Sequence, residues 1–276
     1  MTFIEETVMA PDGLRLYSRR HELEESRGEI VIVHGFGEHS GRYGCLTSHL
    51  VSRRYSVTAY DHRGHGLSDG RPGHVDRFGE YEDDLHQVLV RVHSRRKSAK
   101  IFIIGHSMGG LITLRYLARE PKMVAGGVIS APLIAVAAHV PVHKLMIARV
   151  GARIAPRLQL GNEIDPSVLS RDIEVGNAYA ADPLVNRVVS PRWFNEATRA
   201  MDEAKQLAPL ITAPLLIMHG TDDKLASVDA TKKFFELIGS ADKQLAIFQG
   251  YYHELFNEPE KRQIFEQVSE WLDRRV

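Results

Sequence analysis

Short apolar runs recur along the chain and are separated by segments with a helical repeat. The runs at residues 29–33, 101–104, 124–130 and 213–220 contain few polar positions, which is typical of parallel strands buried on both faces of a sheet. Residues 81–95 place apolar side chains every three or four positions, as an amphipathic helix does. Strands that alternate with helices predict an α/β fold around a mostly parallel sheet.

The amino-terminal residues show a different pattern, in which apolar and polar positions alternate. Residues 2–8 and 14–20 flank the turn sequence Pro11-Asp12-Gly13, so we expect a hairpin at an antiparallel edge of the sheet. Further strands are predicted at residues 54–59 and 244–248. The sheet should then have about eight strands, flanked by helices.

The alternation of strands and helices stops after the apolar run that precedes Ala131-Pro132. Residues 133–210 contain no convincing strand, and their clearest feature is a mostly apolar helical segment at 140–158. We therefore expect one α/β core with a mainly helical cap inserted into it, since folds of this class often exceed the usual domain size. The expected boundaries are 1–130 and 211–276 for the core and 131–210 for the cap.

The cap helix at 140–158 carries Arg149, Arg153 and Arg157 on one stripe and is otherwise apolar. A cap of this kind would form an apolar pocket over the core. The basic stripe either rests on lipid headgroups, as in an interfacial helix, or faces solvent while another side of the helix packs on the core. The sequence leaves peripheral contact with a membrane or micelle open.

Two groups of histidines have spacings that resemble metal sites. His139 and His143 are four residues apart, but no third ligand is apparent, so surface positions are the better interpretation. Asp61, His62 and His65 lie among two glycines and an arginine, which favours a hydrogen-bonded loop. We predict neither a metal nor another cofactor.

Composition narrows the classes of partner. The 276 residues include 35 Lys+Arg and 35 Asp+Glu, so the net charge gives no general attraction for nucleic acid. Cys45 is the only cysteine, which excludes an internal disulfide, and residues 1–6 lack the features of a signal peptide. We therefore expect a cytoplasmic protein. No apolar stretch approaches the roughly 20 residues that span a bilayer, and nothing indicates an oligomeric state.

The strongest chemical signal is Ser107, which follows the apolar run 101–104 and precedes a helical repeat. The serine lies between Gly105 and Gly109 in the pattern Gly-x-Ser-x-Gly. A strand that turns directly into a helix crowds its backbone, so only residues without a Cβ fit two positions to either side of the serine. This turn would push the hydroxyl outward and predicts a nucleophile.

A nucleophilic serine also needs donors for the oxyanion that forms beside it. Met108 begins the helix after the serine, where free N–H groups and the positive end of the helix dipole lie. A second N–H is expected from the glycine-rich loop after strand 29–33, and Phe36 has the right place in that loop. We predict that the Phe36 and Met108 amides form the oxyanion hole.

An acid and a base follow two later strands. Asp223 and His253 come after the strands at 213–220 and 244–248, and the order Ser, Asp, His belongs to the α/β-hydrolases. His253 would accept the serine proton, and Asp223 would orient the imidazole. One other acid and three other bases remain in competition, namely Asp222 and His34, His106 and His219.

With these motifs in place, the chain resembles the monoacylglycerol lipases of the serine α/β-hydrolase superfamily, in their bacterial form, over nearly its whole length. The segments that carry the resemblance are 34–43, 61–68, 105–110, 169–171 and 178–184. The resemblance implies a serine esterase that cleaves monoacylglycerols, or similar esters with one acyl chain, into fatty acid and alcohol through an acyl-serine intermediate. The implied partner is therefore a small lipid ester.

The resemblance also assigns residues. It favours Asp223 over Asp222 as the triad acid, and it places Glu38, Arg42 and Tyr179 near the glycerol-binding end of the site. The alternative for Glu38 and Arg42 is a structural ion pair, and the alternative for Tyr179 is simple packing.

The chain departs from the sequence pattern of the family at one position. Two alternative functions also remain open. Some members carry a second histidine three residues after the triad histidine, where this chain has Phe256, so recognition of the alcohol should differ. A general carboxylesterase or lysophospholipase would use the same triad. A non-catalytic ligand-binding protein of this fold is a third alternative.

Overall fold

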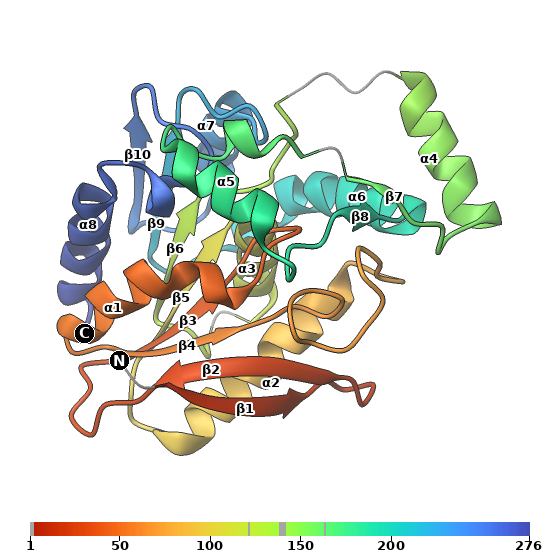
Figure 1. The fold of residues 1–276 in the computed structure, drawn as a ribbon. Coiled ribbons are helices and arrows are strands. Elements are labelled where there is room, and N and C mark those ends of the chain that lie inside the picture. Colours follow the sequence, from red (N-terminus) through yellow and green to blue (C-terminus); the bar gives the residue numbers. More distant parts are fainter. Residues whose placement is uncertain (1–2, 121, 138–141, 163) are drawn as a thin grey trace.

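The computed structural model describes residues 3–120, 122–137, 142–162 and 164–276. An eight-stranded sheet of order β1-β2-β4-β3-β5-β6-β9-β10 forms its centre (Figure 1). The strands are β1 (Ile4–Met9), β2 (Arg15–His21), β3 (Glu29–Val33), β4 (Ser56–Tyr60), β5 (Ile101–His106), β6 (Gly126–Ser130), β9 (Leu215–Gly220) and β10 (Lys243–Phe248). Within the described residues of this sheet, the β1–β2 and β2–β4 pairs are antiparallel and the other pairs are parallel. The predicted α/β-hydrolase sheet is therefore confirmed.

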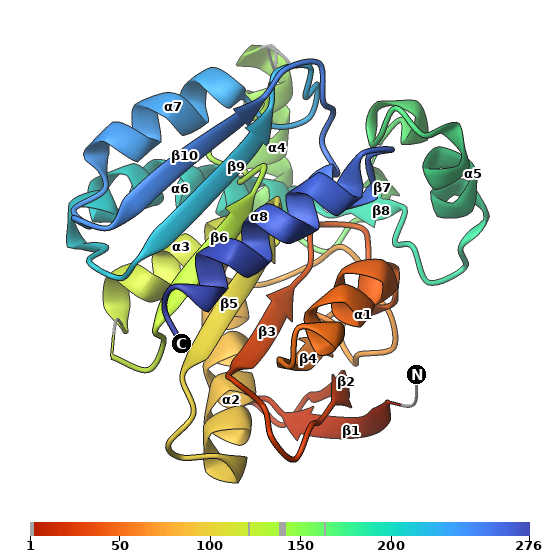
Figure 2. The same ribbon diagram turned by 90° about the vertical axis from the view of Figure 1, so that its left-hand side faces the viewer.

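Helices cover both faces of this sheet. α1 and α8 pack on one face (Figure 2), whereas α2, α3 and α7 pack on the other. Their bounds are α1 (Gly44–Ser52), α2 (Gly79–Arg95), α3 (Met108–Arg119), α7 (Val228–Leu237) and α8 (Lys261–Asp273). The central strands are thus buried on both sides, which explains why their sequences lack polar alternation.

Small residues in the strands let large ones approach the sheet. Trp271 of α8 is buried against Phe102, with ring centroids 6.1 Å apart in an edge-on arrangement. A Cβ on Gly126 would lie 2.8 Å from the Trp271 ring, so this face requires glycine at the start of β6. This close packing of Trp271 against Phe102 and Gly126 fills the core beneath the strands that carry the candidate site.

Between β6 and β9 the chain leaves the sheet and forms a mainly helical segment above the carboxyl ends of the strands. Its helices are α4 (Val142–Ile154), α5 (Ile173–Ala181) and α6 (Pro191–Leu207). The expectation of no strand here was incomplete, because β7 (Leu160–Gly161) and β8 (Val188–Val189) form a short antiparallel pair. A ladder of two residues leaves no detectable period in a sequence. Short 3₁₀ helices occur at Ser40–Tyr43, Pro166–Val168, Ala208–Leu210 and Leu255–Asn257.

The cap is anchored to the core at the start of α6. Ser190 caps this helix by accepting a hydrogen bond from the Trp193 N–H at 3.1 Å, and Pro191 fills the first helical position. The same hydroxyl lies 2.8 Å from His74 Nδ1, and Trp193 Nε1 donates to the Tyr81 hydroxyl at 3.1 Å. These contacts fix one end of the cap over α2 and the loop that precedes it.

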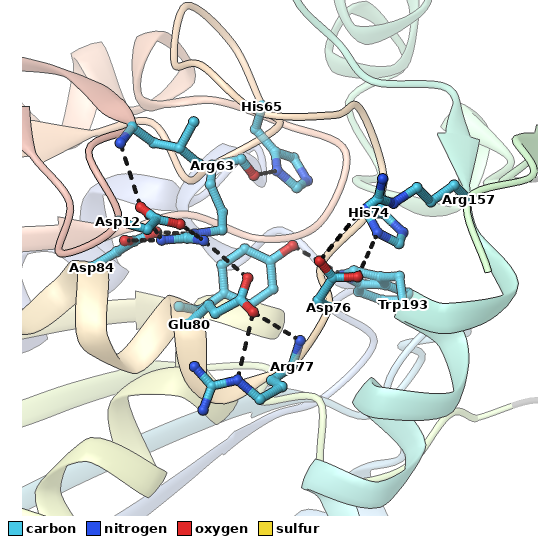
Figure 3. A network of polar contacts seen from close by, with 12 residues as sticks. Asp12, Arg63, His65, His74, Asp76, Arg77, Glu80, Asp84, Arg157 and Trp193 are labelled. Carbon is cyan, nitrogen blue, oxygen red and sulfur yellow. Dashed lines mark hydrogen bonds and ion pairs between the residues drawn. The ribbon is translucent and has the colours of Figure 1, made fainter. Parts of the chain in front are cut away.

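Arg63 is the centre of a buried polar network in the loop between β4 and α2 (Figure 3). Its guanidinium donates to both oxygens of Asp84 at 2.6 Å and to Asp12 and Glu80 at 2.9 Å. Asp61 accepts backbone N–H groups from residues 40 and 67. The loop is therefore held by hydrogen bonds, as its composition favoured.

Two other expectations concern the cap. Arg157 of the predicted basic stripe lies beyond the end of α4, and its guanidinium lies 3.5 Å from the carboxylate of Asp76 in the core (Figure 3). Its side chain is exposed, as those of Arg149 and Arg153 are. The surface positions expected for His139 and the His143 side chain lie outside the described part of the structure. Among the described residues, no helix combines the length and the apolar composition needed to cross a bilayer.

Candidate active site

Ser107 lies at the sharp turn between β5 and α3. Its φ is 52°, a left-handed conformation that costs free energy for a residue with a side chain. A Cβ on Gly105 would lie 2.6 Å from Thr113 Oγ1, and one on Gly109 would lie 2.1 Å from the Val33 carbonyl oxygen. The two glycines are therefore required, as the sequence pattern predicted, and the turn aims the Ser107 side chain at a cavity.

The loop that follows β3 lies beside this turn because β3 and β5 are neighbouring parallel strands. The Gly35 N–H donates to Glu38 Oε1 at 2.6 Å, which fixes the loop, and a Cβ on Gly35 would lie 3.2 Å from Ser107 Cβ. Phe36 lines the same cavity as Ser107. Met108 is the first residue of α3, a position whose N–H has no acceptor within its helix.

Asp223 and His253 meet at the ends of β9 and β10. His253 Nδ1 lies 2.7 Å from Asp223 Oδ2, and both side chains are buried. The other carboxylate oxygen accepts the N–H groups of Leu225 and Ala226 at 2.8 and 2.9 Å. His219 Nε2 lies 3.0 Å from Asp223 Oδ2, so two imidazoles face one carboxylate.

These contacts set the charge states of the pair. Burial alone would raise the pKa of Asp223, but His253, His219 and the hydrogen bonds hold it well below its ordinary value. Burial would lower the pKa of His253, but the Asp223 carboxylate raises it above the ordinary value of 6.5. Asp223 is thus ionised, and it stabilises the protonated imidazole.

The competing residues lie elsewhere or are engaged otherwise. Asp222 is exposed, and its carboxylate accepts a hydrogen bond from the Thr221 hydroxyl at 2.8 Å. His34 is fully buried, with Nδ1 2.7 Å from the Gly35 carbonyl oxygen. His106 packs against His253 at 4.7 Å between ring centroids, and burial followed by the His253 charge lowers its pKa to about 3.

The hydroxyl of Ser107 and the imidazole of His253 line one cavity, but within the described parts of the chain no hydrogen bond joins them. Contacts of this kind are often long in a free enzyme and shorten when substrate binds. The geometry therefore brings the three side chains together, with the carboxylate–imidazole link formed and the hydroxyl–imidazole link open.

The cavity has a volume of about 220 Å³ and lies between the sheet and the cap. Apolar side chains from both parts form most of its wall, including Phe36, Leu133, Val136, Leu169, Trp193 and Phe194. Phe36 packs on Trp193 with ring centroids 4.0 Å apart. The cap therefore completes an apolar pocket, as binding sites for apolar ligands require.

A buried charge cluster adjoins this pocket. Arg42 donates to both oxygens of Glu254, at 2.5 and 2.8 Å, and to Glu38 Oε2 at 3.1 Å. Its guanidinium lies 4.9 Å from the centre of the Tyr179 ring. Glu38, Tyr179 and Glu254 line the pocket, whereas Arg42 lies behind them. Phe256, which stands where some members of the family carry a second histidine, packs in the core against Tyr43.

The two carboxylates of the cluster differ in their environment. Burial raises the pKa of Glu38 despite Arg42. Burial would also raise the pKa of Glu254, but the bidentate pairing with Arg42 holds it below the ordinary value. Glu254 is a pocket residue that was not predicted from the sequence, because its carboxylate is held there by Arg42, which is distant in the chain.

Comparisons with known proteins identify the family and several relatives of the chain. Residues 24–260 match the family model described as "Serine aminopeptidase, S33". The chain is 35% identical over 251 residues to a monoacylglycerol lipase of Mycolicibacterium smegmatis, covering 90% of this chain and 89% of the relative. It is 34% identical over 270 residues to the human monoglyceride lipase, covering 96% and 89%. The crystal structure of a Paleococcus ferrophilus monoacylglycerol lipase superposes over 100% of both chains with a TM-score of 0.85 and 32% identity.

Proposed function

Because the chain belongs to the serine aminopeptidase S33 family and has the α/β-hydrolase fold, we propose that it is a serine esterase that hydrolyses monoacylglycerols to fatty acid and glycerol. The relatives that share a third of its sequence are named lipases, which favours ester over peptide substrates. The observation that carries the proposal is the 2.7 Å contact between Asp223 and His253 at the cavity to which the Ser107 turn points.

The catalytic steps follow from this geometry. His253 Nε2 takes the proton of Ser107 Oγ as the oxygen attacks the ester carbonyl, and Asp223 stabilises the imidazolium. The imidazolium then gives its proton to the leaving glycerol oxygen as the acyl-serine forms. A water molecule, deprotonated by the same imidazole, attacks the acyl-serine and releases the fatty acid and the free serine.

The oxyanion of each tetrahedral intermediate needs two donors. We assign this role to the N–H groups of Phe36 and Met108, because one lies in the loop after β3 and the other begins α3 beside Ser107. The Gly35–Glu38 hydrogen bond holds the first donor in place before substrate arrives. Preorganised donors cost no rearrangement at the moment of reaction.

Substrate recognition divides between the apolar and polar parts of the pocket. The acyl chain would lie along the apolar wall, and the glycerol hydroxyls would meet Glu38 and Tyr179. The Tyr179 hydroxyl is buried and has no partner among the described residues, so it is available to bind a ligand oxygen. Arg42 supports these groups from behind, through its ion pairs and its contact with the Tyr179 ring.

A substrate series tests the proposal directly. We expect 1- and 2-monoacylglycerols to be hydrolysed with a higher kcat/KM than the methyl ester or the lysophosphatidylcholine of the same acyl chain. The reason is that only glycerol can use both Glu38 and Tyr179, since a group lost from a hydrogen-bonded site leaves its partner unsatisfied. Equal rates for glycerol and methyl esters would favour a general carboxylesterase, and preference for the lysolipid would favour a lysophospholipase.

Activity should depend on the protonation of His253. Because Asp223 raises the pKa of this imidazole above 6.5, the base is protonated and inactive at lower pH. We expect kcat/KM for a water-soluble ester to fall about tenfold for each pH unit below the histidine pKa. A profile from pH 5 to 9 measures this limb, and a midpoint clearly below 6.5 would contradict the assigned pairing.

We also propose that the cap contacts a lipid surface from its α4 side. Met146, Val150 and Ile154 of α4 are exposed, and Arg149 and Arg153 are exposed beside them. Apolar side chains flanked by arginines are typical of helices that lie in the headgroup region. The pocket would then receive its substrate directly from the lipid layer.

Sedimentation with vesicles tests this contact. Ile154→Asp should weaken binding to anionic vesicles by about tenfold or more, because burying one such side chain is worth roughly 1.5–3 kcal/mol. Leu237→Asp is the matched control, because Leu237 is an exposed apolar residue of α7, which belongs to the α/β part of the fold and not to the cap. This variant should bind vesicles as the wild type does. Unchanged binding of the Ile154 variant would contradict contact through α4.

A further inference from the structure

The loop after β10 holds His253 by hydrogen bonds on both sides of the residue. The Tyr252 N–H donates to Glu258 Oε1 at 2.7 Å, and the Glu254 N–H donates to the Leu169 carbonyl oxygen at 2.7 Å. The peptide group that follows the histidine and the one that precedes Tyr252 are therefore both fixed. One of the two acceptors belongs to the cap rather than to the core.

The cap segment at residues 169–171 makes further contacts with the same loop. Arg171 Nε donates to Glu258 Oε2 at 2.8 Å, and the Arg171 N–H lies 3.4 Å from the same oxygen. The Ser170 hydroxyl donates to the Asn257 carbonyl oxygen at 3.0 Å. The Arg171 guanidinium also lies 4.4 Å from the centre of the Tyr251 ring. We call the contacts of residues 169–171 with residues 251–258 the clasp.

Glu258 connects the two halves of the clasp. Its side chain is fully buried, with one carboxylate oxygen on the histidine loop and the other on Arg171. A buried carboxylate is costly unless it is paired, and Glu258 has partners at both oxygens, the Arg171 guanidinium and the Tyr252 N–H. Glu260, by contrast, also pairs with Arg171 but is partly exposed.

We propose that Glu258 and Arg171 are positioning residues, which hold the His253 loop against the cap so that the imidazole stays on Asp223 and faces Ser107. The segment 169–171 thereby acquires a role that the proposed mechanism does not otherwise assign. The inference rests on the proposed function, because it concerns the base of that reaction.

The sensitivity of catalysis to position sets the expected effect. A displacement of about 1 Å at a catalytic group can cost on the order of 100-fold in rate. The hydroxyl–imidazole hydrogen bond is not formed in the described structure, so closure of that contact depends on where the loop holds His253. Neither Glu258 nor Arg171 lines the pocket, so substitution of either side chain should leave substrate binding unchanged.

The test compares Glu258→Gln with Glu260→Gln, which remove the same charge from the two partners of one arginine. Three quantities are measured below the melting temperature of each variant. They are kcat/KM for a monoacylglycerol, the rate of Ser107 labelling by a small phosphonate, and the Kd of a non-hydrolysable ether analogue. We expect Glu258→Gln to lower the first two by roughly 10- to 100-fold with an unchanged Kd. Glu260→Gln should stay within about twofold of the wild type on all three.

A second variant covers failure of Glu258→Gln to fold. Arg171→Lys keeps the charge but loses the Nε–H donor and the planar contact with Tyr251, and Arg171 is partly exposed. It should show the same loss of labelling at unchanged Kd. A folded Glu258→Gln or Arg171→Lys variant that labels at the wild-type rate, even with a lower melting temperature, would overturn the proposal.

The experiment distinguishes failure of the clasp proposal from failure of the proposed function. Equal losses in the Glu258 and Glu260 variants would overturn the clasp and leave the proposed function standing. Wild-type protein that neither turns over monoacylglycerol nor reacts with the phosphonate would overturn the proposed function and the clasp with it.

Discussion

Replacing Ser107 with alanine should lower kcat for monoacylglycerol hydrolysis by roughly 10⁶-fold, the scale seen when the nucleophile of a serine protease is removed. The physical reason is that His253 and the oxyanion donors can then act only on a water molecule that nothing holds in place. The rate at which fatty acid is released from a monoacylglycerol measures this effect.

The fold should survive this change. Alanine removes one oxygen from a side chain that makes no hydrogen bond within the described structure, and the left-handed turn at position 107 is unchanged. We expect the free energy of unfolding to stay within about 0.5 kcal/mol of the wild type. The variant should also lose phosphonate labelling. Retention of more than a trace of turnover by a folded, pure variant would show that another residue is the nucleophile.

Replacing Asp223 with asparagine should lower kcat by about 10⁴-fold, as the equivalent change does in a serine protease. An amide in place of the carboxylate would accept from His253 only in one orientation, and it carries no charge to stabilise the imidazolium. Asp222→Asn is the matched control, because this exposed neighbour pairs with the Thr221 hydroxyl and should be nearly neutral.

The pH profile of the Asp223 variant supplies an independent check. The carboxylate is what raises the pKa of His253 against the effect of burial. Without it, the pKa should fall below that of the wild type, and the acidic limb of kcat/KM should move to lower pH. A large loss of activity in the Asp222 variant, with Asp223→Asn nearly unaffected, would reverse the assignment of the acid.

The sequence was sufficient to predict those parts of the molecule that are determined by residues close together in the chain. The turn at Ser107 could be predicted because Gly105 and Gly109 meet backbone and side-chain atoms that any Cβ would strike, and this requirement is visible as a spacing. The buried strands could be predicted from their uniform apolar runs. The order of Ser107, Asp223 and His253 added the expectation that their strand ends converge.

The same reasoning could not predict contacts between residues that are far apart in the chain. Glu254 reaches the pocket because Arg42, far away in the chain, holds its carboxylate. His219, only four residues before Asp223, is a different case, because it was considered only as a competing base and yet lies against the Asp223 carboxylate as a second imidazole. No local pattern distinguishes Arg42 and Glu254 from two unrelated polar residues, because they are 212 residues apart and come together only when the strands assemble.

The place of the cap in the chain has a consequence for biosynthesis. The nucleophile turn lies before the cap, whereas the acid and the base follow β9 and β10, the two strands that complete one edge of the sheet. A ribosome that has finished the cap has therefore made a chain with a serine but no imidazole to activate it. The growing polypeptide should remain harmless to cellular lipids until its last strands are translated and join the sheet.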